Sequence, residues 1–280
     1  MICYPNRIDE STLAGGGWSP ALPLANALDP LLALRARSVD AAPASTVIEI
    51  DLRRIRPVRA VAVIDHNLTA LAEYRVTAAA DGGLDDPLVL TDWLPVFPVI
   101  YPFGSVQWED EHFWTGRAVE DDVEGYRMDL IHLFGNAQLI RRIRIALRDP
   151  GNLAGFVEFG RLFVGDGFAP VYNMSYGNAF NWQPRTDVSE ALSGTETFDV
   201  RRARRVQTIA LDWLTPGDAV AAMELQRTLG IHGEILYLHD PDDMENRHRR
   251  CFLGRLEALS PIEHPYLNTH RWPVRVREIL

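Results

Sequence analysis

The amino-acid sequence predicts a mainly β protein in two parts, an N-terminal β-sandwich and a C-terminal small β-sandwich flanked by one α-helix. In several short runs, apolar residues recur at every second position, as in half-buried strands. Proline and glycine interrupt the chain too often for long helices, and the second half carries one clear helix-start signal. A chain of 280 residues, 47% of them hydrophobic, has the size of two medium domains.

The first half contains a lead-in and the strands of the N-terminal sandwich. The lead-in, residues 18–43, is rich in proline, alanine and leucine and predicts one short helical turn at residues 30–36. Regular alternation begins after it, with Ile48, Ile50 and Leu52 on one face of the first strand. The expected strands are residues 46–52, 58–64, 74–80, 139–147 and 155–164. Their spacing is typical of a sandwich.

The second half predicts a strand, a helix and three further strands. Thr215, Pro216 and Asp218 form the pattern of an N-cap, a first-turn proline and a reciprocal carboxylate, so a helix should run to about Leu229. The expected strands are residues 204–213, 233–239, 249–259 and 272–280. We therefore place the domains at residues 1–168 and 169–280, and the polar segment 170–194 connects them or opens the second.

Charge and composition exclude several classes of function. The formal net charge is −10, which argues against binding to nucleic-acid phosphates. No apolar run reaches the roughly 20 residues of a membrane-spanning helix, and the N-terminus does not resemble a secretory signal. We therefore expect a soluble chain made in a cytoplasm, with no membrane insertion. Cys3 and Cys251 are the only cysteines, and we expect two free thiols.

An aromatic-rich excursion over residues 88–129 is the most distinctive segment. Its prolines and glycines exclude both a long helix and a central strand. The candidate ligand or interface platform within it consists of Trp93, Trp108, Phe113 and Trp114. These rings could pack the loop onto its own sandwich or onto another subunit, or they could stack on a sugar. Neighbouring acidic residues, Glu109, Glu111 and residues 120–122, leave a glycoside hydrolase as a further alternative.

Other polar groups predict turns more readily than chemistry. Residues 65–67, Asp-His-Asn, end a predicted strand, where His66 could be an acid or base or the group could simply close the turn. Residues 81–86 could hold calcium or form a surface turn, and residues 239–248 could hold a metal or form a hairpin loop. The sequence contains no phosphate loop, dinucleotide fingerprint or nucleophile-elbow motif. It thus predicts no catalytic, cofactor or metal residues, and no enzyme.

The first half resembles a discoidin-like, galactose-binding-type domain. The segments that carry this resemblance are residues 25–29, 37–38, 46–52, 61–68, 74–77 and 160–164. The resemblance implies a jelly roll over residues 1–168. The chain lacks the cysteine pair that often closes secreted discoidin domains, so their binding spikes cannot be assigned to residues here.

The layout of the whole chain resembles tail-tip or distal tail proteins of long-tailed bacteriophages. The segments are residues 173–177, 204–213, 252–256 and 260–265. This resemblance implies a virion structural protein of the tail, a ring of six or three copies, and contacts with tube, hub or fibre proteins. The candidate ring-assembly strand contains Trp272, Val274, Val276 and Ile279. The alternative function is a carbohydrate-binding module that binds a host surface glycan without catalysis.

Overall fold

The computed structural model describes residues 1–81, 83–102, 104–117, 122 and 125–280, and its chain folds into two compact units. The large unit comprises residues 6–167 and 238–251, and the small unit comprises residues 1–5, 168–237 and 252–280. The predicted boundary after residue 168 does not separate these units, because residues 1–5 belong to the small unit and residues 238–251 to the large unit. Strand pairing explains the first of these exceptions: Ile2 lies opposite Tyr237 and Cys3 opposite Leu236, which holds the N-terminus in the small unit.

The large unit is built around an antiparallel sheet in the order β10-β4-β8-β5-β6. Two short strands extend it, β2 beside β4 and β7 beside β5, and β3 pairs separately with β9. The strands are β2 Thr12–Ala14, β3 Ala36–Arg37, β4 Val47–Ile64, β5 Glu73–Ala79, β6 Val89–Leu90, β7 Leu94–Pro95, β8 Asp129–Arg148, β9 Glu158–Phe159 and β10 Arg161–Phe168.

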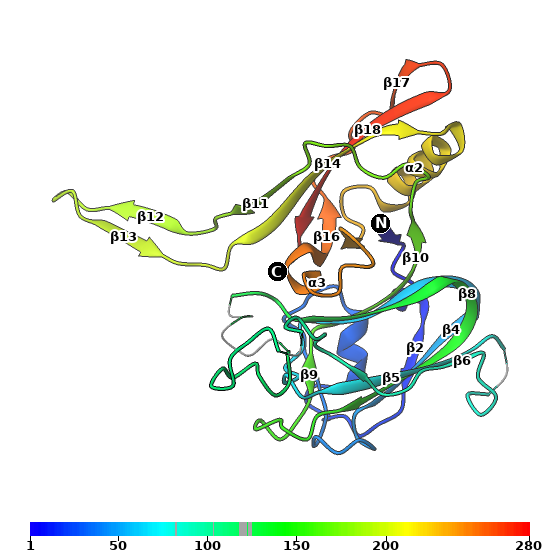
Figure 1. Ribbon diagram of the computed structural model, residues 1–280, viewed down its shortest axis with the longest axis vertical. Helices are drawn as coiled ribbons and strands as arrows, with labels where there is room; N and C mark the ends of the chain where they lie inside the picture. The colour runs from blue at the N-terminus through cyan, green and yellow to red at the C-terminus, as the bar shows by residue number, and fades with distance from the viewer. Residues whose placement is uncertain (82, 103, 118–121, 123–124) are drawn as a thin grey trace. The chain divides into compact units, whose positions relative to one another are not determined.

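The two long strands of this sheet, β4 and β8, pair antiparallel along most of their length (Figure 1). The sequence predicted two strands, at 46–52 and 58–64, where the structure has β4 alone. Arg53 adopts a positive φ of 63°, and the β4–β8 register shifts between Asp51 and Arg56. A bulge of this kind bends a strand without ending it, so the residues between the two predicted strands are part of β4.

The core of the large unit lies between its sheet and the lead-in segment. Alternating residues of β4, β5 and β8 supply one side of the core, and Ile8, Leu24 and Ala27 supply the other. The last three belong to two 3₁₀ helices, η1 Ile8–Glu10 and η2 Leu24–Leu28. The helical turn therefore precedes the predicted residues 30–36. The short helix α3, Arg247–Arg250, also belongs to this unit.

The small unit contains a sheet in the order β11-β14-β18-β16-β15-β1, with β17 beside β18. The helix α2, Pro216–Leu229, ends where the sequence predicted, and its buried residues Ala222, Leu225 and Leu229 pack into the core of this unit. The strands are β1 Ile2–Tyr4, β11 Ala179–Gln183, β14 Arg204–Leu214, β15 Ile235–Leu238, β16 Cys251–Leu256, β17 Glu263–Tyr266 and β18 Thr269–Glu278. The predicted mainly β class is thus confirmed.

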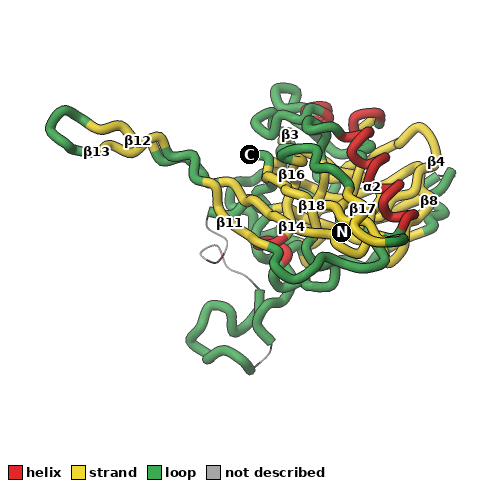
Figure 2. The backbone as a smooth tube through the Cα atoms, turned by 90° about the horizontal axis from the view of Figure 1, so that it is seen from above, coloured by secondary structure: helices red, strands yellow, loops and turns green. Residues whose placement is uncertain are grey.

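A two-stranded hairpin continues the small unit beyond β11 and β14. Its strands are β12, Asp187–Glu190, and β13, Glu196–Asp199, which pair antiparallel with Val188 opposite Phe198. Figure 2 shows this hairpin stretching away from β11 and β14. We call residues 187–199 the arm. The sequence does not predict these strands, since the polar composition of residues 170–194 indicates a connection or the opening of the second domain.

Candidate functional site

An open groove on the large unit is the candidate functional site. Its volume is about 600 Å³, within the range of small-ligand sites. Leu71, Glu73, Trp114, Thr115, Arg117, Arg148 and Pro150 line it. We call it the Trp114 groove, because this indole is 84% exposed although it belongs to the groove wall.

Two neighbouring strands place two charged side chains of the groove, Glu73 and Arg148. Glu73 is the first residue of β5 and Arg148 is the last of β8, and the register sets them opposite each other. The Arg148 Nε donates to Glu73 Oε2 at 3.0 Å, and the two side chains form an ion pair. The sheet therefore fixes a donor and an acceptor side by side where these two strands end.

Trp93 lies next to this pair. The Arg148 guanidinium carbon is 4.8 Å from the centre of the Trp93 ring, and that of Arg75 is 5.1 Å from it. Cation–π contacts of this kind restrict a guanidinium that is otherwise flexible. Trp93 is half-buried and does not line the groove. Its contribution is to orient Arg148.

Trp114 projects from a turn that backbone bonds hold in place. Gly116 N–H donates to the His112 carbonyl at 2.7 Å, and the Gly116 carbonyl accepts from the N–H groups of Ile100 and Tyr101 at 2.7 and 2.9 Å. Gly116 has a φ of 61°, and a Cβ there would stand 2.5 Å from the Tyr101 carbonyl oxygen. Only glycine fits this close approach without a shift of the backbone.

His112 adds side-chain bonds to the same turn. Its Nε2 lies 2.7 Å from Asp122 Oδ2, and its Nδ1 contacts Asp110 Oδ1. Hydrogen bonds to Asp110 and Asp122 raise the pKa of His112, and bonds from the backbone and the ring of His112 lower the pKa of Asp110. Protonated His112 thus links two acidic positions of the loop.

The predicted aromatic platform is only partly assembled at this site. Phe113 packs edge-on against Trp114, with ring centres 5.1 Å apart. Trp108 is 70% exposed and does not line the groove. Trp114 is therefore the member that the groove uses directly. Sequence reasoning missed Glu73, Arg117 and Arg148, although Glu73 and Arg148 directly flank predicted strands.

Among the described residues, the acidic side chains of the loop do not line the Trp114 groove. Glu109 and Glu111 are exposed, Asp122 accepts from His112, and Glu120 and Asp121 lie outside the described residues. Glu73 is the one carboxylate among the described residues that line the groove, and Arg148 holds it. Glycoside hydrolysis requires two carboxyl groups that flank the scissile bond.

Residues 65–67 have structural partners. Asp65 forms an ion pair with Arg35 at 2.7 Å, and the Asn67 side chain bonds the backbone of Phe156 and Glu158. His66 is buried, and its Nδ1 accepts from the Leu68 N–H at 3.2 Å. Burial lowers the pKa of His66 to about 4, so the ring is neutral at pH 7.

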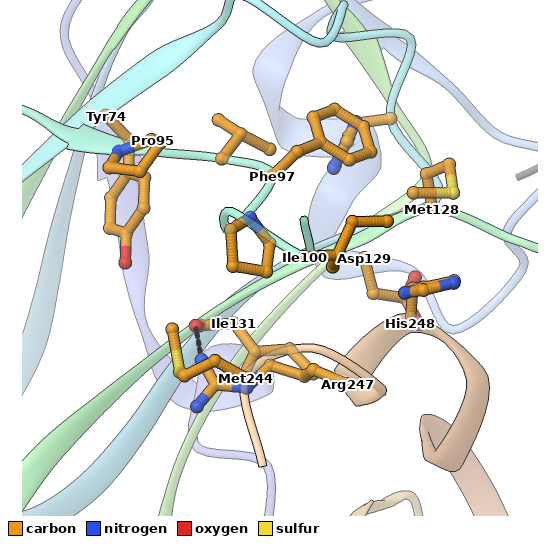
Figure 3. A pocket seen from close by; sticks show the side chains of 13 residues that line it. Tyr74, Pro95, Phe97, Ile100, Met128, Asp129, Ile131, Met244, Arg247 and His248 are labelled. Atoms are coloured by element: carbon orange, nitrogen blue, oxygen red, sulfur yellow. Dashed lines mark hydrogen bonds between the residues drawn. The ribbon is translucent and has the colours of Figure 1, made fainter. Parts of the chain in front are cut away.

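A small cavity adjoins His66. Its walls include Phe97, Ile131, Met244 and Arg247, and Figure 3 shows the bond from Arg247 to the carbonyl of Ile131, at 3.1 Å. The cavity measures about 30 Å³, which admits a water molecule but not a sugar ring. It is therefore not the candidate site.

The remaining candidates for metal binding have other contacts. Asp81 binds Arg141 at 2.9 Å, Gly82 lies outside the described residues, and Asp243 accepts from Asn246 at 3.0 Å. Within the described ranges, no group of three or more His, Cys, Asp or Glu side chains could hold a metal ion.

Cys3 and Cys251 are buried free thiols. No described helix is long and apolar enough to cross a membrane.

The candidate ring-assembly strand lies inside its own unit. β18 is hydrogen-bonded to β14 on one side and to β16 on the other. Trp272, Val274 and Val276 are at most 3% exposed and form part of the core, and Ile279 is half-buried. Trp272, Val274 and Val276 therefore present no open apolar face to another copy, because they pack in the core of their own unit.

Several solved structures that the chain matches are carbohydrate-binding or lectin domains. No family model and no curated protein matches the chain. The family 32 carbohydrate-binding module of Clostridium perfringens NanJ, solved with galactose, is 14% identical with a TM-score of 0.40, and the match covers 59% of this chain and 98% of that one. The lectin domain of lectinolysin, solved with Lewis B antigen, is 10% identical with a TM-score of 0.38, and the match covers 58% and 96%. At these values the similarity says nothing about a ligand of this chain, and these structures give no support to a tail-tip identity.

Proposed function

We propose that this chain is a non-catalytic protein that binds carbohydrate through the Trp114 groove. The observation that carries the proposal is the exposed indole of Trp114 beside the Glu73–Arg148 pair in an open groove of about 600 Å³. Water contact with a large apolar ring is unfavourable, and a ligand with an apolar face and polar edges removes it. Sugar rings have both properties.

The groove offers each kind of contact that a sugar uses. The apolar face of the sugar ring stacks on Trp114, while its hydroxyl groups accept from Arg117 and Arg148 and donate to Glu73. Arg117 also donates to the Ala70 carbonyl at 3.2 Å, which fixes its direction. Two guanidinium groups against one carboxylate leave a positive charge, so the groove favours glycans that carry a carboxylate over neutral ones.

A glycan array with the labelled full chain tests this proposal, with Trp114→Ala as the variant and Trp108→Ala as the matched control. Loss of the stacking surface should weaken binding about tenfold, which corresponds to ~1.4 kcal/mol. Trp108 is similarly exposed but does not line the groove, so its removal should leave binding within about twofold of wild type, as for surface substitutions away from a site. An array without any bound glycan, or equal losses in both variants, would refute the proposal.

A second candidate is a structural protein of a phage tail tip, located in the virion tail and bound to tube, hub or fibre proteins. The arm favours it, because a long exposed hairpin suits contact with a neighbouring chain. Mass spectrometry of purified phage particles from a host that encodes this chain would detect it among the virion proteins. Its absence from such particles would exclude this role.

A further inference from the structure

The arm exposes apolar side chains along its whole length. All residues of β12 and β13 are exposed, and the cross-strand pair Val188 and Phe198 is 57% and 56% exposed. Leu192 at the turn is fully exposed. An isolated two-stranded hairpin is marginally stable in water at best. The arm therefore gains stability from any surface that covers it.

The arm carries negative charge at its tip. Glu190 and Glu196 lie directly opposite each other in the register, and neither has an ion-pair partner among the described residues. Like charges opposite each other destabilise a strand pair. By contrast, Asp187 and Asp199, further from the tip, are both bonded to Arg201. The negative charge of the arm is therefore uncompensated at the tip, where a positively charged group would stabilise it.

The base of the arm has the opposite charge. Arg204 starts β14 opposite Gln183 of β11, and Arg185 and Arg277 lie close enough to repel it. The Arg204 Nε is buried and has no hydrogen-bond partner among the described residues. Burial is the main cause that lowers the pKa of Arg204, followed by repulsion from the other two arginines.

Glu278 attracts Arg204, but this carboxylate is already hydrogen-bonded to another residue. Glu278 is buried and accepts from the Arg205 backbone N–H at 2.9 Å and from its guanidinium at 2.5 Å. The three arginines Arg185, Arg204 and Arg277 thus make a basic patch, and no ion pair to them is found among the described residues. An acidic partner would compensate the patch.

The tip cannot reach the base of its own arm. Glu190 is five positions beyond Arg185, a separation of about 17 Å between their Cα atoms in an extended strand. We infer that the arm docks on a second copy of this chain, with its Glu190–Glu196 tip on the basic patch of the neighbour. The outer edge of β11 carries no strand among the described residues, so it is open to backbone pairing along the same contact. Such a contact gives a closed dimer when two arms lie antiparallel and a ring when it runs head to tail.

The solution mass of the full chain tests this inference, measured by light scattering in low salt and in about 0.5 M salt, where charges are screened beyond a few ångströms. Wild type should be larger than a monomer, and high salt should shift it toward the monomer. Glu190→Arg with Glu196→Arg should be monomeric. Asp85→Arg with Asp86→Arg changes the net charge equally at an exposed turn of the large unit and should assemble like wild type.

Charge exchange between two variants separates a lost contact from a damaged fold. Arg185→Glu with Arg277→Glu should also be monomeric, yet mixing it with the tip variant should restore a larger species, because each supplies the charge that the other lacks. A monomeric wild type in low salt, or a tip variant with unchanged mass, would overturn the inference. Trp114→Ala should assemble normally, so failure of glycan binding and failure of assembly are separate results.

Discussion

Two buried histidines make the large unit sensitive to acid. His66 and His132 are each 8% exposed, and burial lowers the pKa of both to about 4. In the unfolded chain a histidine has a pKa near 6.5, so the unfolded state binds more protons between pH 6.5 and 4. Stability is therefore fully present above pH 6.5 and is lost as the pH falls toward 4.

The loss should be large enough to measure by urea unfolding. Each histidine contributes about 3 kcal/mol between the two pKa values, by proton linkage. His132→Phe keeps an aromatic ring beside Phe134 and removes one titration, so its free energy of unfolding should fall less than that of wild type between pH 7 and pH 5. An identical pH dependence in both proteins would show that His132 is not a neutral buried group.

The histidine of the Trp114 turn should have the opposite pH dependence. Contacts with Asp110 and Asp122 raise the pKa of His112, so the charged form holds the turn below that pKa and is lost as the pH rises through it. Glycan affinity should therefore decrease from pH 6 to pH 8.5. In His112→Gln the affinity should be lower at pH 6 and should change little with pH. The measurement is a calorimetric titration at each pH.

At this scale the sequence proposed single residues but not their partners. The aromatic-rich segment predicted Trp114 as a platform, because an exposed loop with several tryptophans is conspicuous. The Glu73–Arg148 pair was missed, since it depends on the register of β5 against β8. A shift of one residue would separate the two side chains, and a single sequence does not determine the register of strands that lie this far apart along the chain.

Helix α2 shows what local chemistry can predict at the scale of elements. Thr215 Oγ1 accepts from the Asp218 N–H at 3.2 Å, and Asp218 Oδ2 accepts from the Thr215 N–H at 3.2 Å, as the sequence pattern indicates. Thr215→Ala should destabilise the chain by about 1 kcal/mol, and Thr215→Ser should restore most of it. Thermal unfolding measures both. Equal melting temperatures for Thr215→Ala and wild type would mean that the reciprocal hydrogen bonds of Thr215 and Asp218 contribute nothing to stability.

The buried ion pair of Arg205 in β14 and Glu278 in β18 should contribute more to stability than the helix cap. The Arg205 and Glu278 side chains are each 1% exposed. Removal of one partner leaves a buried charge, so Glu278→Gln should destabilise the small unit by about 3 kcal/mol or more. Arg205→Met combined with Glu278→Leu should cost less than the single change, and denaturant unfolding of all three proteins compares them. A double variant that is less stable than Glu278→Gln would contradict this explanation.

The arm was not predictable from the same kinds of signal. Residues 187–199 do not alternate apolar and polar side chains in the way that half-buried strands do, because neither face of the hairpin is buried. The Ser193-Gly194 turn, with Gly194 at a φ of 79°, was the available hint. Strands that a partner covers need not show the pattern of strands that a protein covers by itself.

At the scale of the whole molecule, the large unit is completed by a distant segment. Residues 238–251 belong to it, and Arg247 donates to the Ile131 carbonyl of β8 at 3.1 Å. A fragment of residues 6–167 should therefore unfold at a lower temperature than the same fragment joined to residues 238–251 by a flexible linker. Calorimetry compares the two. Equal melting temperatures would show that residues 238–251 do not stabilise the unit.

The prediction of a mainly β chain with two parts depended on composition and alternation, which are local properties. The assignment of the N-terminus to the small unit depended on the pairing of β1 with β15, which are far apart in the sequence. No local pattern marks such a pairing, because each three- or four-residue strand resembles many others. The absence of catalysis stays a prediction at this scale.

Glycan binding in the Trp114 groove is the central claim, and hydroxyl-radical footprinting of the full chain tests it most directly. The tightest glycan from the array is added, and oxidation of each tryptophan is read by peptide mass spectrometry. We predict that the glycan protects Trp114 and leaves Trp108 and Trp213 unchanged, since all three are exposed in the free protein. Protection of Trp213 or Trp108 with Trp114 still oxidised would contradict the account.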